Sequence, residues 1–276
     1  MSAKICLTNK CYYSLLVNSS DSYADCWPPF FLLLNKYWDL CHAKVYLNTQ
    51  SKTFRHDAFP NLTSTCAETR AGRTLTWSEC LLSALDSIDT PLVLYMQEDY
   101  FVSRLVLGDR IDVAATYMMD HPEIGHIGLT KHGSRGPFSK SKYDDLLLIN
   151  KKAKYRISTQ AGLWRVETLK SYLEASENGW MFEIFGTWRS HRRNDVFLTV
   201  PFDVASGGPC IDYLHTGIVK GKWLPGIQEV FQQNGIEVDY DRRGFYTEKS
   251  WPIRKLETGR YLLRRPIYML RQLFGI

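Results

Sequence analysis

Two adjacent carboxylates close an apolar run in the first half of the chain. Pro91 precedes the run Leu92–Met96, and Gln97, Glu98 and Asp99 follow it directly. A short run with β-branched and aromatic members favours a strand that is buried on both faces. An unpaired charge inside such a layer is costly, so the acids must lie at the carboxyl end of the strand. There they could hold a divalent cation against phosphates. The alternative is a solvated acidic turn that caps the next segment.

The chain before these acids alternates between strand and helix patterns. Tyr12–Asn18 (YYSLLVN) reads as a strand, and the polar turn SSDSYADCW supplies several helix caps before the apolar run Pro29–Trp38. A second strand is predicted at Ala43–Leu47, followed by a helix whose apolar residues share one face. That helix, capped by Thr76 or Ser78, leads into the strand that ends in the acids. This alternation indicates a parallel sheet covered by helices, and ligands bind such sheets at the carboxyl ends of the strands.

The same alternation continues beyond the acids, without an internal repeat. The segment Thr130–Lys142 is polar and contains glycine, and we expect a mobile loop there. No linker divides the chain before about Lys222. The elements expected after Phe101 are a helix over 109–122, strands at Ile124–Leu129, Leu146–Lys151, Lys154–Trp164 and Asp195–Val200, and helices at Val166–Ala175 and Trp180–His191.

The composition is that of a folded chain. Its 276 residues are 45% hydrophobic and 23% charged, enough to bury a sizeable core. The 7 cysteines include no C-x-x-C pair, so we expect reduced core thiols in a cytoplasmic protein and not a zinc site. The sequence shows no secretory pattern at its start and no apolar run of membrane-spanning length. We therefore expect a soluble or peripherally bound protein.

The positive charge gathers at the C-terminal end. The segment from Trp251 to Ile276 carries six basic residues and one acid, which accounts for the whole net charge of +5. Arginines alternate there with apolar residues, and Pro266 should divide the segment into two short amphipathic pieces. One interpretation is a C-terminal helix docked on the domain; the other is an anchor on an anionic membrane surface at the inner face of the membrane. The neutral body of the chain argues against nucleic-acid binding. The anchoring arginines would be Arg260, Arg264, Arg265 and Arg271.

The strand that ends in LYMQEDY, after an early strand, turn and helix, resembles the acidic metal motif of GT-A-fold glycosyltransferases. The likeness is closest to their inverting family 2 type and spans about residues 12–222. It implies a GT-A-like α/β fold with a mainly parallel, helix-covered sheet, a nucleotide-sugar donor, and Mn²⁺ or Mg²⁺ on the diphosphate. Asp99 then matches the metal-binding acid, and Glu98 contacts the donor or compensates for Gln97, which replaces the first acid of the family's motif.

The resemblance also implies a donor site on the loop after the first strand. In the family this loop cradles the nucleoside, which makes Asn18, Ser19 and Asp21 candidates; simple helix capping is the alternative. Arg73, ahead of the next helix, could pair with the diphosphate or the base, or lie on the surface. Late in the chain, CIDYLHTGIVKGKW places His215 where many GT-A enzymes complete the metal site. Lys220 and Lys222 would grip the diphosphate. The alternative for His215 is a structural role.

The acceptor half implied by the resemblance lies in STQAGLWRVETLKSYL and ENGWMFEIFGTW. By position, Glu183 matches the catalytic base of inverting members, and Trp180 and Phe182 flank it. A carboxylate among rings is desolvated, which raises its pKa toward the range useful for proton abstraction. An exposed helical glutamate is the alternative. Trp164 and Trp180 would offer ring surfaces to acceptor sugars.

These features together predict a glycosyltransferase of the hexosyltransferase type. We expect a catalytic domain over 1–222, with a nucleotide-binding half to about 103 and an acceptor half over 104–222, and a C-terminal extension over 223–276. The Gln-x-x-Arg-Trp motif of processive members is absent, which favours single sugar additions to a saccharide or lipid-linked acceptor in bacterial-type surface polysaccharide synthesis. The alternatives are a nucleotidyltransferase of sugar phosphates and a non-catalytic carbohydrate-binding protein with this fold.

Overall fold

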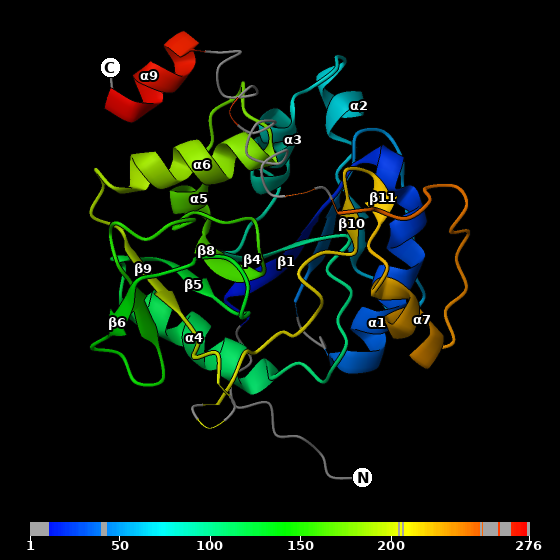
Figure 1. Ribbon diagram of the computed structural model, residues 1–276, viewed down its shortest axis with the longest axis horizontal. Coiled ribbons are helices and arrows are strands. Elements are labelled where there is room, and N and C mark those ends of the chain that lie inside the picture. Colours follow the sequence, from blue (N-terminus) through cyan, green and yellow to red (C-terminus); the bar gives the residue numbers. More distant parts are fainter. Residues whose placement is uncertain are drawn as a thin grey trace.

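A single mixed sheet organises the part of the chain that the structure describes, residues 11–39, 43–203, 205, 207–248, 250, 259 and 266–274 of this computed structural model (Figure 1). Its nine strands lie in the order β3-β2-β1-β4-β8-β5-β9-β7-β6. β1, β2, β3 and β4 are mutually parallel, β8 runs against both β4 and β5, and β5 is parallel to β9. The strands are β1 (Tyr13–Asn18), β2 (Val45–Asn48), β3 (Leu62–Ser64), β4 (Leu92–Gln97), β5 (Ile124–Gly128), β6 (Phe138–Lys140), β7 (Leu147–Ile149), β8 (Gly162–Arg165) and β9 (Val196–Thr199).

Helices cover both faces of this sheet, as Figure 1 shows. Apolar side chains of α3, α5 and α6 pack in one buried cluster, and those of α1, α4 and α7 pack in the other. The helices are η1 (Asp21–Cys26), α1 (Trp27–Tyr37), α2 (Ala67–Ala71), α3 (Trp77–Leu85), α4 (Gly108–Asp120), α5 (Val166–Tyr172), α6 (Gly179–Ser190), α7 (Ile227–Gln233) and α9 (Pro266–Phe274). The predicted helix-covered, mainly parallel sheet is confirmed.

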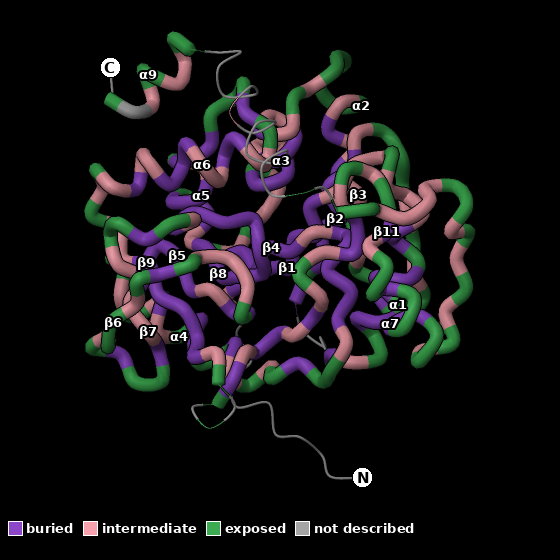
Figure 2. Tube along the Cα trace, viewed as in Figure 1, coloured by how far each residue is buried: buried purple, intermediate pink, exposed green. Residues whose placement is uncertain are grey.

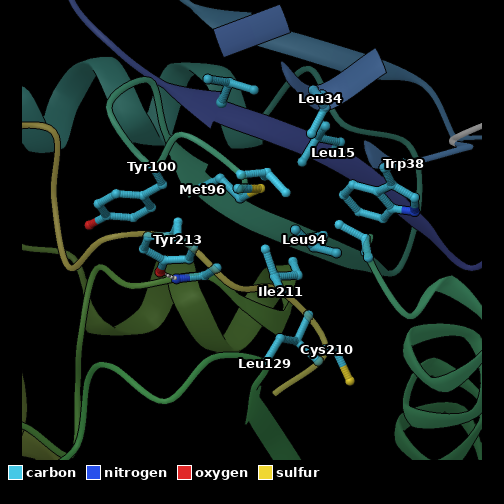
Figure 3. Close-up of a cluster of buried hydrophobic side chains, with 14 of the residues drawn as sticks. Leu15, Leu34, Trp38, Leu94, Met96, Tyr100, Leu129, Cys210, Ile211 and Tyr213 are labelled. Atoms are coloured by element: carbon cyan, nitrogen blue, oxygen red, sulfur yellow. Dashed lines mark hydrogen bonds between the residues drawn. The ribbon is translucent and has the colours of Figure 1, made fainter. Parts of the chain in front are cut away.

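β4 is buried on both faces, as its apolar run predicts. Leu94 and Met96 enter one core cluster, together with Leu15 of β1 (Figure 3). Val93 and Tyr95 enter the cluster on the opposite face. Because side chains alternate across a strand, every residue of the run is buried, and the polar residues begin where the run ends.

The helix that leads into β4 begins at the cap predicted for it. The Thr76 hydroxyl accepts a hydrogen bond from the Glu79 backbone N–H at 3.1 Å, and the Glu79 carboxylate accepts one from the Thr76 N–H at 2.8 Å. This capping box is the signature of a helix N-terminus. Of the two predicted caps, Thr76 is the one that the structure uses.

Several predicted boundaries were wrong. The predicted strand Lys154–Trp164 is a strand only over β8, and residues 154–161 form turns and bends. The expected loop Thr130–Lys142 contains the short edge strand β6, which pairs with β7. The helix predicted to Ala175 ends at Tyr172. The short elements β3 and α2 have no clear hydrophobic period, and the sequence did not predict them.

The C-terminal extension begins inside the same core as the strands. Trp223 is fully buried and packs against Phe101, which follows β4, and Phe231 of α7 contacts the same ring. A short hairpin, β10 (Ile218–Val219) and β11 (Lys222–Trp223), makes the transition. The basic residues Arg260, Arg264 and Arg265 lie outside the described residues. Within the described chain, no helix has the length and apolarity needed to cross a membrane.

Candidate active site

Three amide side chains lie in register at the carboxyl ends of β2, β1 and β4. Asn18 pairs with Asn48 on one side and with Gln97 on the other. The Asn18 amide accepts a hydrogen bond from Asn48 at 2.7 Å and donates one to the Tyr95 hydroxyl at 3.1 Å. Gln97 donates to the same hydroxyl at 3.2 Å. Asn18 is buried, and its two polar atoms are engaged within this network, which fixes the edge of the sheet beneath the acids.

Asp21 connects the loop after β1 to residues 50–52 through hydrogen bonds. Its carboxylate accepts hydrogen bonds from the backbone N–H groups of residues 50–52 at 3.0–3.1 Å and from the Ser51 hydroxyl at 2.6 Å. Burial raises the pKa of Asp21, but these hydrogen bonds outweigh it and hold the pKa below its ordinary value. The Ser19 hydroxyl accepts a hydrogen bond from the Trp27 indole at 2.7 Å. Ser19 and Asp21, which were predicted to bind the nucleotide-sugar donor, thus form hydrogen bonds that hold the loop in place.

Arg73 lies just before α3 and is exposed. Its guanidinium pairs with Glu79 at 2.7 Å, the acid of the capping box. To bind Arg73, a diphosphate would therefore have to displace Glu79 from this exposed ion pair. Such a pair contributes little to the stability of the fold.

Asp99 turns from the end of β4 toward the loop that carries His215. Its carboxylate accepts a hydrogen bond from the Thr216 hydroxyl and one from the Ile218 backbone N–H at 3.1 Å. The Asp99 carbonyl accepts from the Gly217 N–H at 2.8 Å. Burial raises the pKa of Asp99, and the hydrogen bonds from Thr216 and Ile218 oppose this rise. The structure therefore brings the predicted metal acid and the predicted histidine loop together.

Gly217 is required by this close approach. A Cβ atom at this position would lie 2.4 Å from the Phe101 ring and 2.9 Å from the Asp99 carbonyl oxygen. Any side chain would push the loop away from β4, so the contact to Asp99 depends on this glycine.

Glu98 lies near η1, since its charge contributes to raising the pKa of Tyr23 and that of Cys26, after burial. Its side chain is only 7% exposed, and its pKa lies well above the ordinary value because of burial and the neighbouring charge of Asp99. The Arg243 guanidinium acts on Glu98, but it is already paired with Asp25 at 2.6 Å. Within the part of the chain that the structure describes, neither of the two adjacent buried carboxylates forms an ion pair.

Glu98 and Asp99 are the candidate ligands for a divalent cation at this corner. Among the described residues, no group of three or more His, Cys, Asp or Glu side chains is placed to hold a metal. Mg²⁺ and similar ions are, however, often bound by one or two carboxylates, with the remaining ligands coming from phosphates and water. Glu98 and Asp99 could supply this smaller donor set, and an added cation would favour their ionised forms against the burial that raises both pKa values.

His215 and the two predicted lysines follow one another along this loop and hairpin. The His215 ring is 5.2 Å from the ring of His132, and partial burial together with His132 and Arg135 lowers the pKa of His215. His215 is nonetheless exposed, and among the described residues it forms no metal-binding group with Glu98 and Asp99. Lys220 and Lys222 are exposed on the β10–β11 hairpin. Their ammonium groups are therefore exposed to solvent, on the hairpin that follows the loop contacting Asp99.

Glu183 lies on α6 and is held by a neighbouring loop. Its Oε1 atom accepts hydrogen bonds from the Thr159 N–H and hydroxyl, each at 2.8 Å, and from the Ser158 hydroxyl at 3.4 Å. Burial raises the pKa of Glu183, and these hydrogen bonds partly oppose the rise. No hydrogen bond from the described residues reaches Oε2, so that oxygen can accept a proton.

One tyrosine joins the acidic corner to Glu183. Tyr100 follows Asp99 directly, donates to the Thr159 carbonyl at 3.1 Å and accepts from the Gln160 amide at 3.1 Å. Its ring stacks on Tyr213, with centroids 4.7 Å apart, and Figure 3 shows the two rings side by side. The negative charges of both Asp99 and Glu183 contribute to raising the pKa of Tyr100, after burial. The two acids therefore lie within electrostatic range of one ring.

The predicted role of Trp164 was wrong. Its side chain is 1% exposed, and its ring packs against His126 at 4.2 Å and Phe197 at 5.6 Å. A ring in the core cannot stack on a sugar. Trp180, in the first turn of α6, is partly exposed and stays a candidate.

The sequence did not point to Arg243. Its guanidinium donates to the Asp25 carboxylate, to the Ser22 carbonyl at 2.8 Å and to the Gly221 carbonyl at 3.3 Å. It also lies 4.7 Å from the centre of the Tyr23 ring. Arg243 thereby ties η1 to the loop before β11. Because its partners are far away in the sequence, only its position in a basic pair, DYDRRGF, could have drawn attention to it.

No protein-family model matches the sequence, and no curated protein is significantly similar to it. Solved structures do resemble the chain. TarS from S. aureus matches 84% of this chain and 41% of its own length, with 12% identity and a TM-score of 0.50. Glucosyl-3-phosphoglycerate synthase from Mycobacterium tuberculosis, complexed with Mn²⁺, UDP-glucose and phosphoglyceric acid, matches 82% and 81%, with 11% identity and a TM-score of 0.44. A cytidylyltransferase from Leptospira borgpetersenii matches 87% and 100%, with 8% identity and a TM-score of 0.43.

The chain has a GT-A-like fold. At these identities the likeness concerns the fold alone, and the chain spans only 58% and 41% of the length of two of the TarS chains that it matches. A fold does not determine an activity, so the choice between glycosyl and nucleotidyl transfer depends on the chain's own residues.

Proposed function

We propose that this chain transfers one sugar from a nucleotide-sugar donor to a hydroxyl of a saccharide or lipid-linked acceptor. The observation that supports this most directly is the buried pair Glu98 and Asp99 at the carboxyl end of β4. The Arg243 guanidinium that acts on Glu98 is already paired with Asp25, and Tyr100 and Thr159 connect this corner to Glu183. Transfer to a hydroxyl needs these two functions: charge compensation for a leaving phosphate and a base for the acceptor.

On the donor side, Glu98 and Asp99 would hold Mn²⁺ or Mg²⁺, with the remaining ligands coming from the diphosphate and water. The bound ion supplies positive charge to the departing diphosphate. Lys220 and Lys222 extend from the hairpin that follows and would bind the outer phosphate oxygens. The loop at Ser19 and Asp21, fixed by its internal hydrogen bonds, would receive the nucleoside.

On the acceptor side, Glu183 removes the proton from the attacking hydroxyl. The acceptor oxygen then forms a bond to the anomeric carbon, while the bond from that carbon to the phosphate oxygen breaks and its electron pair leaves with the nucleoside diphosphate. Oε1 is held by Thr159 and Ser158, so the proton goes to Oε2. A single displacement of this kind inverts the anomeric centre. Trp180 lies at the start of the same helix, where it would contact an acceptor sugar.

The nearest rival is a nucleotidyltransferase, which shares the fold and the acidic corner. The loop after β1, NSSDSYAD, is acidic and lacks the glycines and basic residues that such enzymes need to hold a triphosphate. In nucleotidyl transfer the nucleophile is the phosphate of a sugar phosphate, which is already ionised. That reaction therefore needs no base to remove a proton from the nucleophile. Glu183 therefore favours glycosyl transfer.

The products of the reaction decide between these activities. The protein is incubated with Mn²⁺ and UDP-, GDP-, CMP- and dTDP-sugars, and in parallel with nucleoside triphosphates and sugar 1-phosphates. Slow release of free nucleotide from one of the nucleotide sugars supports the proposal. Release of pyrophosphate from the second set would instead assign nucleotidyl transfer, and no turnover with any donor would indicate a binding protein.

A further inference from the structure

The C-terminal helix α9 presents an apolar face to solvent. Ile267, Leu270 and Phe274 are 80%, 48% and 64% exposed. Their spacing of three and four residues places them on one side of the helix. Figure 2 shows α9 at the outside of the molecule, with no buried segment. Large exposed apolar side chains are otherwise scattered singly in the described chain, on α1, on α4 and in the loop before α4. A contiguous row of this kind marks an interaction surface.

The opposite side of α9 is attached to α6. The Tyr268 hydroxyl donates to Glu177 at 2.7 Å, and its ring packs against Phe185 with centroids 5.3 Å apart. The Gln272 side chain accepts a hydrogen bond from Arg189 at 2.8 Å, and its carbonyl accepts one from Arg192 at 3.0 Å. Figure 1 shows α9 beside α6. The orientation of α9 is therefore fixed by specific contacts, and its apolar row faces outward because its polar row faces the protein.

These contacts cover an ion pair that would otherwise be open. The side chains of Glu177 and Arg189 are 0% and 12% exposed and lie 2.7 Å apart. Tyr268 and Gln272 each bond to one member of this pair. A buried charge pair needs its remaining hydrogen bonds satisfied, so α9 contributes to the stability of this part of the fold.

The sequence segment that contains this apolar row carries an excess of positive charge. The segment from Trp251 onward holds the entire net charge of the chain, and Arg264 and Arg265 directly precede α9 in the sequence. An apolar helix face that is accompanied by arginines matches a membrane interface, where apolar side chains enter the acyl boundary and cations meet anionic head groups. A protein partner would more commonly match the apolar row with a groove, without requiring so strong a basic excess.

We propose that α9 docks this chain on an anionic lipid surface, with Ile267, Leu270 and Phe274 entering the bilayer interface. The inference goes beyond the proposed reaction and does not depend on it. It has a geometric consequence, because α6 contacts α9 through Phe185 and Arg189 and contacts the 158–159 segment through Glu183. Docking would therefore place α6, and not the edge strands β3 or β6, nearest to the membrane.

Cosedimentation with lipid vesicles tests this proposal. Wild-type protein should bind vesicles of mixed phosphatidylcholine and phosphatidylglycerol, bind pure phosphatidylcholine weakly, and dissociate from the mixed vesicles as salt is raised. For the variant Ile267→Ser/Phe274→Ser, the partition coefficient onto the mixed vesicles should fall at least about tenfold. Each apolar side chain that enters the bilayer interface contributes to the free energy of binding. The matched control is Leu105→Ser, because Leu105 is 71% exposed on the loop before α4, and it should bind as wild type does.

Two results would overturn the proposal. One is equal binding of wild type and the double variant, with both proteins showing the same thermal midpoint. The other is a dimer in vesicle-free buffer that the double variant abolishes, because the apolar row would then belong to a contact with a second copy. Release of nucleotide from a soluble donor is measured on the same samples, so that loss of membrane binding is distinguished from loss of the proposed reaction.

Discussion

Thr159 donates two hydrogen bonds to the same oxygen of Glu183, one from its backbone N–H and one from its hydroxyl, and each donor–acceptor distance is 2.8 Å. The carbonyl of the same residue accepts a hydrogen bond from Tyr100, the neighbour of Asp99. One residue of the 154–161 loop therefore sets the position of the candidate base relative to the acidic corner. If Glu183 acts as the base, Oε2 must accept the proton, because Oε1 already accepts the hydrogen bonds from Thr159 and Ser158.

The first prediction concerns Glu183→Gln. The amide keeps the shape of the side chain but cannot accept the acceptor proton, so transfer should fall by about 10²–10⁴-fold. Donor binding, measured by calorimetry with a nucleoside diphosphate and Mn²⁺, should stay as in wild type. Turnover close to the wild-type rate would remove Glu183 from this role.

The second prediction concerns the pH profile. Burial raises the pKa of Glu183, and the Thr159 hydroxyl opposes this rise. The base must be ionised, so the rate falls as pH drops through this pKa. Thr159→Val removes the hydroxyl and should raise the pKa further, which shifts the acidic limb to higher pH and lowers the rate on that limb roughly threefold to tenfold. Thr159→Ser keeps a hydroxyl and serves as the control. Identical acidic limbs for all three proteins would show that Thr159 does not tune Glu183.

The third prediction concerns Asp99. Asp99→Asn keeps acceptors for Thr216 and Ile218 but removes the charge that would hold the cation. Titration of a nucleoside diphosphate with Mn²⁺ should show at least about tenfold weaker binding, while binding without the ion should be the same in both proteins. Unchanged metal-dependent affinity would exclude a cation at this corner.

The fourth prediction concerns stability and follows from Glu98. Its pKa lies well above the ordinary value because of burial and Asp99, so the folded protein retains a proton that the unfolded chain releases. The free energy of unfolding should therefore fall as pH rises from the ordinary glutamate pKa to the raised value. Glu98→Gln should remove this decline and stabilise the cation-free protein at neutral pH by about 1 kcal/mol or more.

Thermal midpoints between about pH 5 and about pH 8 in chelator-treated buffer test this expectation. Glu237→Gln is a suitable control, because Glu237 is exposed after α7 and should behave as wild type does. A parallel decline in wild type and Glu98→Gln would show that Glu98 does not carry the effect.

The sequence predicted the parts of the fold in which local pattern and burial agree. The run Leu92–Met96 is bounded by Pro91 and by the acids, so both the strand and the position of Glu98 and Asp99 at its end could be inferred. The cap at Thr76 follows from the same local chemistry. The insertion of β8 between β4 and β5, antiparallel to both, could not be predicted, because hydrophobic period does not encode the order of strands in a sheet.

The contacts of the candidate site depend on tertiary structure. Asp99 meets Thr216 across 117 positions of sequence, and Asp25 meets Arg243 across 218. The segment 154–161 was mistaken for a strand because of its alternating residues, and the structure instead uses it as the loop that holds Glu183. Trp164 was misplaced for a related reason: an aromatic residue suits both a sugar site and a core strand, and only burial distinguishes the two.

The last prediction concerns Arg243, which the sequence did not indicate. The Arg243 and Asp25 side chains are 10% and 15% exposed, so Arg243→Ala leaves a largely buried carboxylate without its partner. The free energy of unfolding should fall by about 3 kcal/mol, measured by denaturant titration, and the combination with Asp25→Asn should cost less than the sum of the two single changes. Arg243→Lys should recover only part of the loss, because an ammonium cannot form the two-pronged contact. The neighbouring Arg242 is exposed, so Arg242→Ala should leave the stability within about 0.5 kcal/mol of wild type. Equal effects of the changes at positions 242 and 243 would mean that the tie between η1 and the loop before β11 does not stabilise the protein.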